Sequence, residues 1–212
     1  MLLARIVDVP QDVDARLAEL GLDQAILAEA LRQANLHWAR KTEHHPRLYR
    51  YQIMWGETIA ALRDLLAPRG WRKCDEGNYE LTVNAARDLA IVVASGDDGT
   101  ANPHRTPSNR SPKGRHTIDA VAANRQADMF AELLPVSPAA EKSIATWVLL
   151  HHRSDKKIQA ELSRPNEMDD DGMIVSWSER LLLRDIALDG ERISITPPQL
   201  PDIDFEISRK AS

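Results

Sequence analysis

Residues 79–94 read Tyr-Glu-Leu-Thr-Val-Asn-Ala-Ala-Arg-Asp-Leu-Ala-Ile-Val-Val-Ala, and this stretch decides the fold class. Its two ends, 79–83 and 89–94, are rich in β-branched and apolar residues, and a short polar connection separates them. Such a pattern predicts a β-hairpin. Upstream of it, apolar residues recur at steps of three and four, as they do in helices. A helical first third therefore changes to strands at this hairpin.

Two amphipathic helices are predicted before the hairpin. Asp23 is placed to be the N-cap of the first helix, because its carboxylate can accept hydrogen bonds from backbone N–H groups. Pro46 interrupts the helical pattern, since its ring disfavours a helical conformation at the preceding residue. The second helix is expected over 49–66 and ends at Pro68 and Gly70. We expect the two helices to form an antiparallel hairpin.

After the hairpin, the sequence predicts one helix and then a block of strands. Thr117 is expected to cap a helix that reaches about residue 133. Its inner face would consist of Ile118, Val121, Ala122, Met129 and Leu133. Strands are expected over 144–152, from 158 onward and over 173–183, with 192–196 as one more candidate. In the strand from 158, Ile158, Ala160 and Leu162 alternate with Gln159 and Glu161, which is typical of a half-buried strand.

This order of elements predicts a single α+β domain over residues 1–212. The domain would be helical over 10–70, mixed over 78–134 and strand-rich over 143–196, followed by a tail over 197–212. An N-terminal helical hairpin would pack with an antiparallel sheet and one further helix. Because helices and strands are segregated, alternating βαβ units and doubly wound dinucleotide-binding folds are not expected.

Composition and charge limit the classes of function. The chain is 43% apolar and 28% charged, as globular proteins are. Its net charge of −5 gives no electrostatic attraction of the whole chain to nucleic acid or to an anionic membrane. Cys74 is the only cysteine, so an internal disulfide is excluded, and its mixed basic and acidic neighbours give little support for a nucleophile. No apolar run reaches the ~20 residues of a membrane span. A cytoplasmic protein without a membrane partner is the expectation.

The polar segment 95–116 has almost no apolar side chains and lies between a predicted strand and a predicted helix. From 100 to 117 it contains several basic residues and no acidic residue. It ends at the expected helix N-terminus, where unpaired N–H groups favour anions. Gly114 would let the backbone approach a ligand closely. The predicted ligand-binding residues are Arg105, Arg110, Lys113, Gly114, Arg115 and Thr117.

Three interpretations of segment 95–116 remain open at this point. It can be a flexible solvated loop, given its Pro, Ser, Asn and Gly content. It can bind a phosphate, a nucleic-acid backbone or an acidic protein surface. It can also be catalytic, with Asp97, Asp98, His104 and His116 as metal or acid–base candidates. The segment contains no glycine-rich phosphate-binding motif, and no motif identifies a cofactor.

Two other groups of residues are candidates for a site. No histidine or cysteine spacing is typical of a metal site, and the adjacent His151 and His152 on one strand would point to opposite faces. A basic cluster interleaved with aromatic residues could bind single-stranded nucleic acid. That cluster consists of Arg40, Lys41, Arg47 and Arg50 with Trp38, Tyr49 and Tyr51. Because the whole chain is acidic, the favoured alternative places Trp38 in the core and the arginines at the surface of a turn.

Four stretches carry a resemblance: Ala94-Ser-Gly-Asp-Asp-Gly-Thr100, continued by 106–108 and 112–114, and Trp177-Ser-Glu-Arg-Leu-Leu-Leu183. In their order the chain resembles uncharacterised bacterial proteins carried on mobile elements or prophages, over most of its length. The resemblance implies a setting and no reaction. The leading hypothesis is a non-catalytic binding or regulatory protein, of a mobile element or a phage–host conflict, that engages an anionic ligand through 95–116. The alternatives are an enzyme acting on a phosphate-containing substrate with the same loop, and an oligomeric interaction module.

Overall fold

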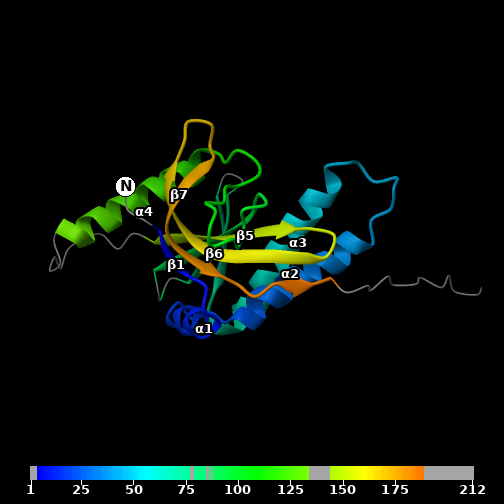
Figure 1. The fold of residues 1–212 in the computed structure, drawn as a ribbon, viewed down its shortest axis with the longest axis horizontal. Coiled ribbons are helices and arrows are strands. Elements are labelled where there is room, and N and C mark those ends of the chain that lie inside the picture. Colours follow the sequence, from blue (N-terminus) through cyan, green and yellow to red (C-terminus); the bar gives the residue numbers. More distant parts are fainter. Residues whose placement is uncertain (1–3, 77–78, 85, 87, 134–143, 189–212) are drawn as a thin grey trace, which may run out of the picture.

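The computed structural model describes residues 4–76, 79–84, 86, 88–133 and 144–188, and it is an α+β structure (Figure 1). Its helices are α1 (Pro10–Glu19), α2 (Gln24–Ala39), α3 (Tyr49–Leu66) and α4 (Arg115–Leu133), with a 3-10 turn at Ala67–Arg69. Its strands are β1 (Arg5–Val7), β2 (Arg72–Glu76), β3 (Tyr79–Asn84), β4 (Leu89–Ser95), β5 (Ala145–Arg153), β6 (Lys157–Met168), β7 (Ile174–Leu182) and β8 (Ile186–Ala187).

The predicted helical hairpin is confirmed as α2 and α3. The carboxylate of Asp23 caps α2 by accepting a hydrogen bond from the backbone N–H of Ile26, 2.8 Å away. Asp23 also pairs at 2.6 Å with Arg69, which follows the end of α3, while His37 near the end of α2 lies 3.6 Å from Glu57 of α3. The start of one helix therefore lies beside the end of the other, as in an antiparallel pair.

The sheet is mixed, which corrects the prediction of an antiparallel sheet. The strand order is β1-β7-β6-β5-β4-β3-β2, with β8 paired to β6. β1 pairs with β7 in parallel, and β4 pairs with β5 in parallel; the other pairs are antiparallel. The parallel pair arises because α4 carries the chain from the end of β4 back to the start of β5. This connection is a βαβ unit, which segregation of the elements had led us not to expect.

The two faces of the sheet have different coverings. Helices α1 to α3 pack on one face, where alternate side chains of β4, β5 and β6 join those of the helices in the main core. The loop 96–114 and α4 cover the other face, which carries a smaller apolar cluster of Ala94, Val148, Leu150, Ile174 and Trp177. Figure 1 shows α4 and α1 on opposite sides of the strands. Successive residues of β5 therefore point either to the helical hairpin or to the loop.

Several predicted details of local structure were wrong. Helix α4 begins at Arg115, so Thr117 lies in its first turn and is not the N-cap. Ala122 and Met129 are exposed and do not belong to an inner face, whereas Val121 is buried. Strand β2 was not foreseen, and Glu161 is fully buried because the loop covers the face that was expected to meet solvent. The strand predicted over 192–196, the tail over 197–212 and the side chain of Leu133 lie outside what the structure describes.

Candidate functional site

The loop 96–114 is fixed to the sheet by a buried ion pair. Arg180 of β7 is 2% exposed and Glu161 of β6 is 0% exposed. Arg180 donates from Nε and Nη2 to the two carboxylate oxygens of Glu161, at 3.0 and 2.6 Å. It also donates to the backbone carbonyls of Arg105 and Asn102, at 2.8 and 3.2 Å, and Glu161 accepts the N–H of Ala101 at 2.7 Å. Loop backbone thus supplies the polar partners that a buried pair requires.

A second set of hydrogen bonds fixes the middle of the loop. The indole N–H of Trp177 donates to the carbonyl of Pro107 at 2.8 Å. The amide of Asn109 donates to the carbonyl of Gly172 and accepts the N–H of Ile174, at 3.0 and 2.7 Å. Asp97 accepts the N–H groups of Gly99 and Ser108 within the loop. These hydrogen bonds hold the segment in one conformation, which argues against the interpretation as a flexible solvated loop.

The predicted basic residues of this loop do not gather at the N-terminus of α4. Arg105 forms two hydrogen bonds of 2.8 Å to Asp98, and Arg115 pairs with Asp119 one helical turn further on. Lys113 is partly buried, and this burial lowers the pKa of its ammonium group. Gly114 is exposed, and a Cβ atom there would meet nothing within 4 Å. Thr117 is buried in the first turn of the helix.

The four predicted acid–base or metal candidates have separate surroundings. Asp97 is occupied by loop N–H groups, and Asp98 by Arg105. His104 is exposed, while His116 stacks on Tyr79 with 6.0 Å between the ring centroids. Among the residues that the structure describes, no group of three or more His, Cys, Asp or Glu side chains could hold a metal ion. The structure therefore does not bring these four candidates together.

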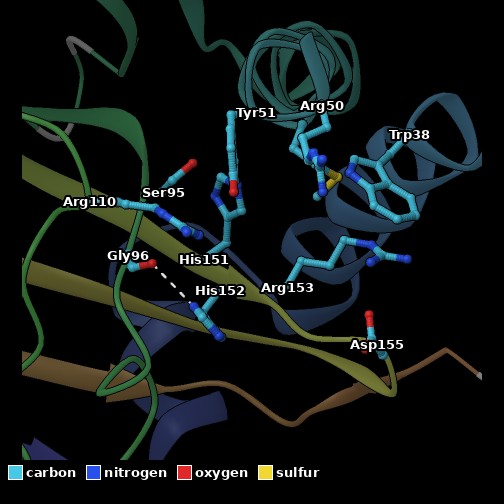
Figure 2. A pocket seen from close by; sticks show the side chains of 11 residues that line it. Trp38, Arg50, Tyr51, Ser95, Gly96, Arg110, His151, His152, Arg153 and Asp155 are labelled. Carbon is cyan, nitrogen blue, oxygen red and sulfur yellow. Dashed lines mark hydrogen bonds between the residues drawn. The ribbon is translucent and has the colours of Figure 1, made fainter. Parts of the chain in front are cut away.

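Arg110 is a predicted ligand-binding residue that lines a pocket. The pocket has a volume of about 130 Å³ and lies where the carboxyl ends of the parallel strands β4 and β5 meet helices α2 and α3 (Figure 2). Ligands in α/β sheets commonly bind outside the carboxyl ends of strands. The pocket is lined by Trp38, Arg50, Tyr51, Met54, Ser95, Gly96, Arg110, His151, His152, Arg153 and Asp155. Only Arg110 of these was predicted to bind the ligand.

Three arginines from three different elements line this pocket (Figure 2). Arg50 comes from α3, Arg110 from the loop and Arg153 from β5. Within the described residues, none of the three forms an ion pair with a carboxylate. They contact aromatic rings instead: Cζ of Arg110 and of Arg50 lie 4.6 and 5.9 Å from the ring centroid of Tyr51. Positive charge therefore accumulates in this pocket.

Arg153 is held by uncharged partners at the side of the pocket. Its Cζ atom lies 3.3 Å from the ring centroid of Trp38, and its Nε donates to the side-chain oxygen of Asn35 at 2.8 Å. Burial lowers the pKa of Arg153, and the charge of Asp155 opposes this effect. Asp155 is the one acidic residue that lines the pocket. A guanidinium stays charged under these conditions, because its ordinary pKa lies far above neutral pH.

His151 supplies a buried polar atom that has no partner. It is on the face of β5 that meets α2 and α3, and burial lowers the pKa of its ring to about 4, with Lys113 and His152 adding to the effect. In the part of the chain that the structure describes, its Nδ1 forms no hydrogen bond. At neutral pH the ring is therefore uncharged, with one nitrogen a donor and the other an acceptor. Buried polar atoms without a partner are rare and call for an explanation.

The neighbouring histidine, His152, has a different environment. Its Nδ1 lies 3.3 Å from the carbonyl oxygen of Gly96, at the side of the sheet that the loop covers (Figure 2). The prediction that His151 and His152 point to opposite faces of the sheet is confirmed. His151 was not predicted to be a site residue, and no sequence signal distinguishes it, since its burial depends on the helices that pack on its face of the sheet.

The comparisons with known proteins give no family for this chain. It matches no protein-family model, no curated protein and no solved structure. No described helix is long and apolar enough to cross a membrane. Function therefore has to follow from the side chains of the site.

Proposed function

We propose that this protein binds a phosphate-bearing anion in the basic pocket formed by Arg50, Arg110, Arg153 and His151. It acts as a binding protein, and the loop 96–114 serves to hold Arg110 in place. The observation that carries the proposal is that one pocket is lined by three arginines that have no carboxylate partner among the described residues. Like charges in one pocket repel each other, and a bound anion would remove that repulsion.

The chemistry of the lining residues favours a phosphoryl group. A guanidinium presents N–H donors in a planar fork that matches two oxygens of a phosphate. The neutral ring of His151 adds a further donor or acceptor, according to its tautomer. The pocket, of about 130 Å³, has room for one phosphoryl group.

The loop holds Arg110 in a fixed position before an anion binds. The backbone N–H of Arg110 donates to the carbonyl of Ser95 at 2.8 Å, and its neighbour Asn109 is bonded to the β6–β7 turn. The buried pair of Glu161 and Arg180 holds the earlier part of the same loop. A binding residue whose backbone is fixed loses little conformational entropy when the ligand arrives.

Calorimetric titration with inorganic phosphate and pyrophosphate tests the proposal. Replacing Arg110 by Gln removes one guanidinium without removing a core residue. Because hydrogen bonds to charged groups contribute about 1.5–3 kcal/mol, affinity should fall by roughly 10- to 100-fold. Arg115→Gln is the matched control, since Arg115 is 85% exposed and its carboxylate partner among the described residues is Asp119. Its affinity should equal that of the wild type.

Two results would contradict the proposal. One is the absence of phosphate and pyrophosphate binding at low ionic strength, where screening is weakest. The other is an equal loss of affinity in the Arg110→Gln and Arg115→Gln variants, because that would show a general charge effect and no pocket.

A further inference from the structure

The surface next to the pocket, at the tip of the α2–α3 hairpin, carries both positive charge and exposed apolar side chains. We infer that the anion bound in the pocket is a phosphate of single-stranded nucleic acid, whose neighbouring nucleotides lie along this tip. The inference rests on the proposed function and specifies its ligand. The tip is defined as residues 38–51, from the end of α2 to the start of α3.

The distribution of ion pairs singles out the tip and the pocket. Most described arginines are paired with carboxylates: Arg5, Arg16, Arg32, Arg63, Arg69, Arg105, Arg115, Arg125, Arg164, Arg180 and Arg184. Apart from Arg72 on β2, the described arginines without such a pair are Arg40, Arg47, Arg50, Arg110 and Arg153. All five of these belong to the tip or the pocket. The only acidic residue in 38–51 is Glu43, so the local charge is positive although the chain is acidic.

Two aromatic rings connect the charges of the pocket with those of the tip. The ring of Trp38 has Arg153 of the pocket at 3.3 Å and Lys41 of the tip at 4.9 Å. The ring of Tyr51 has Arg110 and Arg50 within 4.6 and 5.9 Å of its centroid. Each of the two rings therefore has two cations beside it. This interleaving is the pattern by which proteins bind single strands without sequence preference.

Exposed apolar side chains add surfaces on which bases can stack. Leu48 is 69% exposed, and Tyr49 and Tyr51 are 37% and 38% exposed. Tyr49 stacks in parallel on His45 with 4.7 Å between the ring centroids, which fixes the plane of its ring. The chain has three tyrosines, and the third, Tyr79, is largely buried. Both exposed tyrosines thus lie where the unpaired arginines gather.

The geometry favours a single strand over a duplex. In a duplex the bases are stacked inside and cannot reach Tyr49 or Tyr51, whereas a single strand exposes its base faces. The phosphate site is also recessed between α3, the loop and β5, so a flexible backbone can enter it more easily than a rigid rod. From the sequence alone, these arginines were predicted to lie at the surface of a turn and not to bind nucleic acid. The basic pocket beside them now favours nucleic-acid binding.

Fluorescence anisotropy with a labelled 12-nucleotide oligouridylate tests the inference, in parallel with calorimetry using inorganic phosphate. The variant Tyr49→Ser should weaken oligonucleotide binding by roughly tenfold or more, because stacking on an aromatic ring contributes strongly for each base. It should leave phosphate binding unchanged. Met129→Ser is the matched control, since Met129 is an exposed apolar residue on α4. Arg110→Gln should weaken both ligands and lower the salt slope of oligonucleotide binding by about 0.7.

The outcomes separate this inference from the proposed function. One outcome is that phosphate binding depends on Arg110 while the oligonucleotide binds no more tightly than phosphate. That result would support the proposed anion-binding pocket and refute single-stranded nucleic acid as its ligand. Equal affinity for the 12-nucleotide strand and its duplex would refute it too, as would an unchanged affinity in Tyr49→Ser. Binding to vesicles of anionic phospholipid without binding to the oligonucleotide would assign the tip to a membrane surface. If the wild-type protein does not bind phosphate at all, the proposed function itself is overturned.

Discussion

The buried pair of Arg180 and Glu161 should be the most sensitive point of this structure to substitution. Arg180→Met keeps an unbranched side chain of similar length and removes the guanidinium. The carboxylate of Glu161 would then retain only the hydroxyl of Ser163 at 2.8 Å and the N–H of Ala101 at 2.7 Å. Removing one partner of a buried ion pair costs about 3–5 kcal/mol, because the remaining charge stays in a medium of low polarity. We expect a loss of this size in the free energy of unfolding.

Urea denaturation followed by circular dichroism measures this loss, and the chain offers a matched control. Arg184 also pairs with a carboxylate at 2.6 Å, that of Asp14, but the two side chains are 55% and 46% exposed. Exposed pairs contribute about 0–1 kcal/mol, so Arg184→Met should change the free energy of unfolding by no more than that. Two arginines with equal contact distances would thus differ several-fold in effect, and burial would be the reason.

A double variant separates stability from the order of the loop. In Glu161→Met/Arg180→Met no charge is left unpaired, so most of the lost stability should return, as it does for other buried pairs replaced by apolar residues. The loop would still lack the contacts at Ala101, Asn102 and Arg105, and the N–H of Ala101 should exchange faster with solvent. A loss below about 1 kcal/mol in Arg180→Met would refute the reasoning, since a buried pair that is broken should cost more.

Two further predictions concern the walls of the pocket. A Cβ atom on Gly96 would lie 2.2 Å from Oγ1 of Thr100 and 2.7 Å from Cγ of Leu150, so Gly96→Ala should lower the free energy of unfolding by about 1–3 kcal/mol. Gly114→Ala should leave the free energy of unfolding unchanged, because a Cβ atom there meets no atom within 4 Å. Equal denaturation midpoints for Gly96→Ala and Gly114→Ala would contradict this prediction. The pKa of His151 is about 4 in the folded protein and about 6.5 when unfolded, so the unfolded chain takes up the proton first as the pH falls. Stability should therefore decline by up to about 3 kcal/mol between pH 6.5 and 4, and His151→Gln should flatten this part of the profile relative to the wild type.

Local patterns in the sequence were sufficient to predict the helical hairpin of α2 and α3 and the strand pair of β3 and β4. Helix α3 spans the residues predicted from its apolar spacing, and Asp23 caps α2 because capping depends only on neighbouring residues. The parallel pairing of β4 with β5 was missed although its signal was present. A predicted helix of about 17 residues between two predicted strands is long enough for a crossover between parallel strands. The segregation of the other elements outweighed that signal.

The site could be predicted only in part, because tertiary contacts decide which charges stay unpaired. The pair of Arg115 with Asp119 could have been foreseen, since residues four apart on a helix are neighbours. The pairing of Arg105 with Asp98 depends on the path of the loop, which is set by Arg180 more than seventy residues further along the chain. Nothing local distinguishes Arg110 from these two arginines. Its place in the pocket follows from the fold, which turns it toward Tyr51 of α3.

The net charge of the whole chain does not predict whether the protein has an anion-binding site. Charges on a protein surface are screened beyond roughly 8–10 Å at physiological ionic strength, so most acidic residues of this chain do not act on the pocket. Many of them are also neutralised locally by the arginines with which they pair. What a ligand meets in the pocket is the field of Arg50, Arg110 and Arg153, reduced by Asp155 alone among the lining residues. An acidic protein can therefore attract an anion, because pairing elsewhere leaves its unpaired cations in one place.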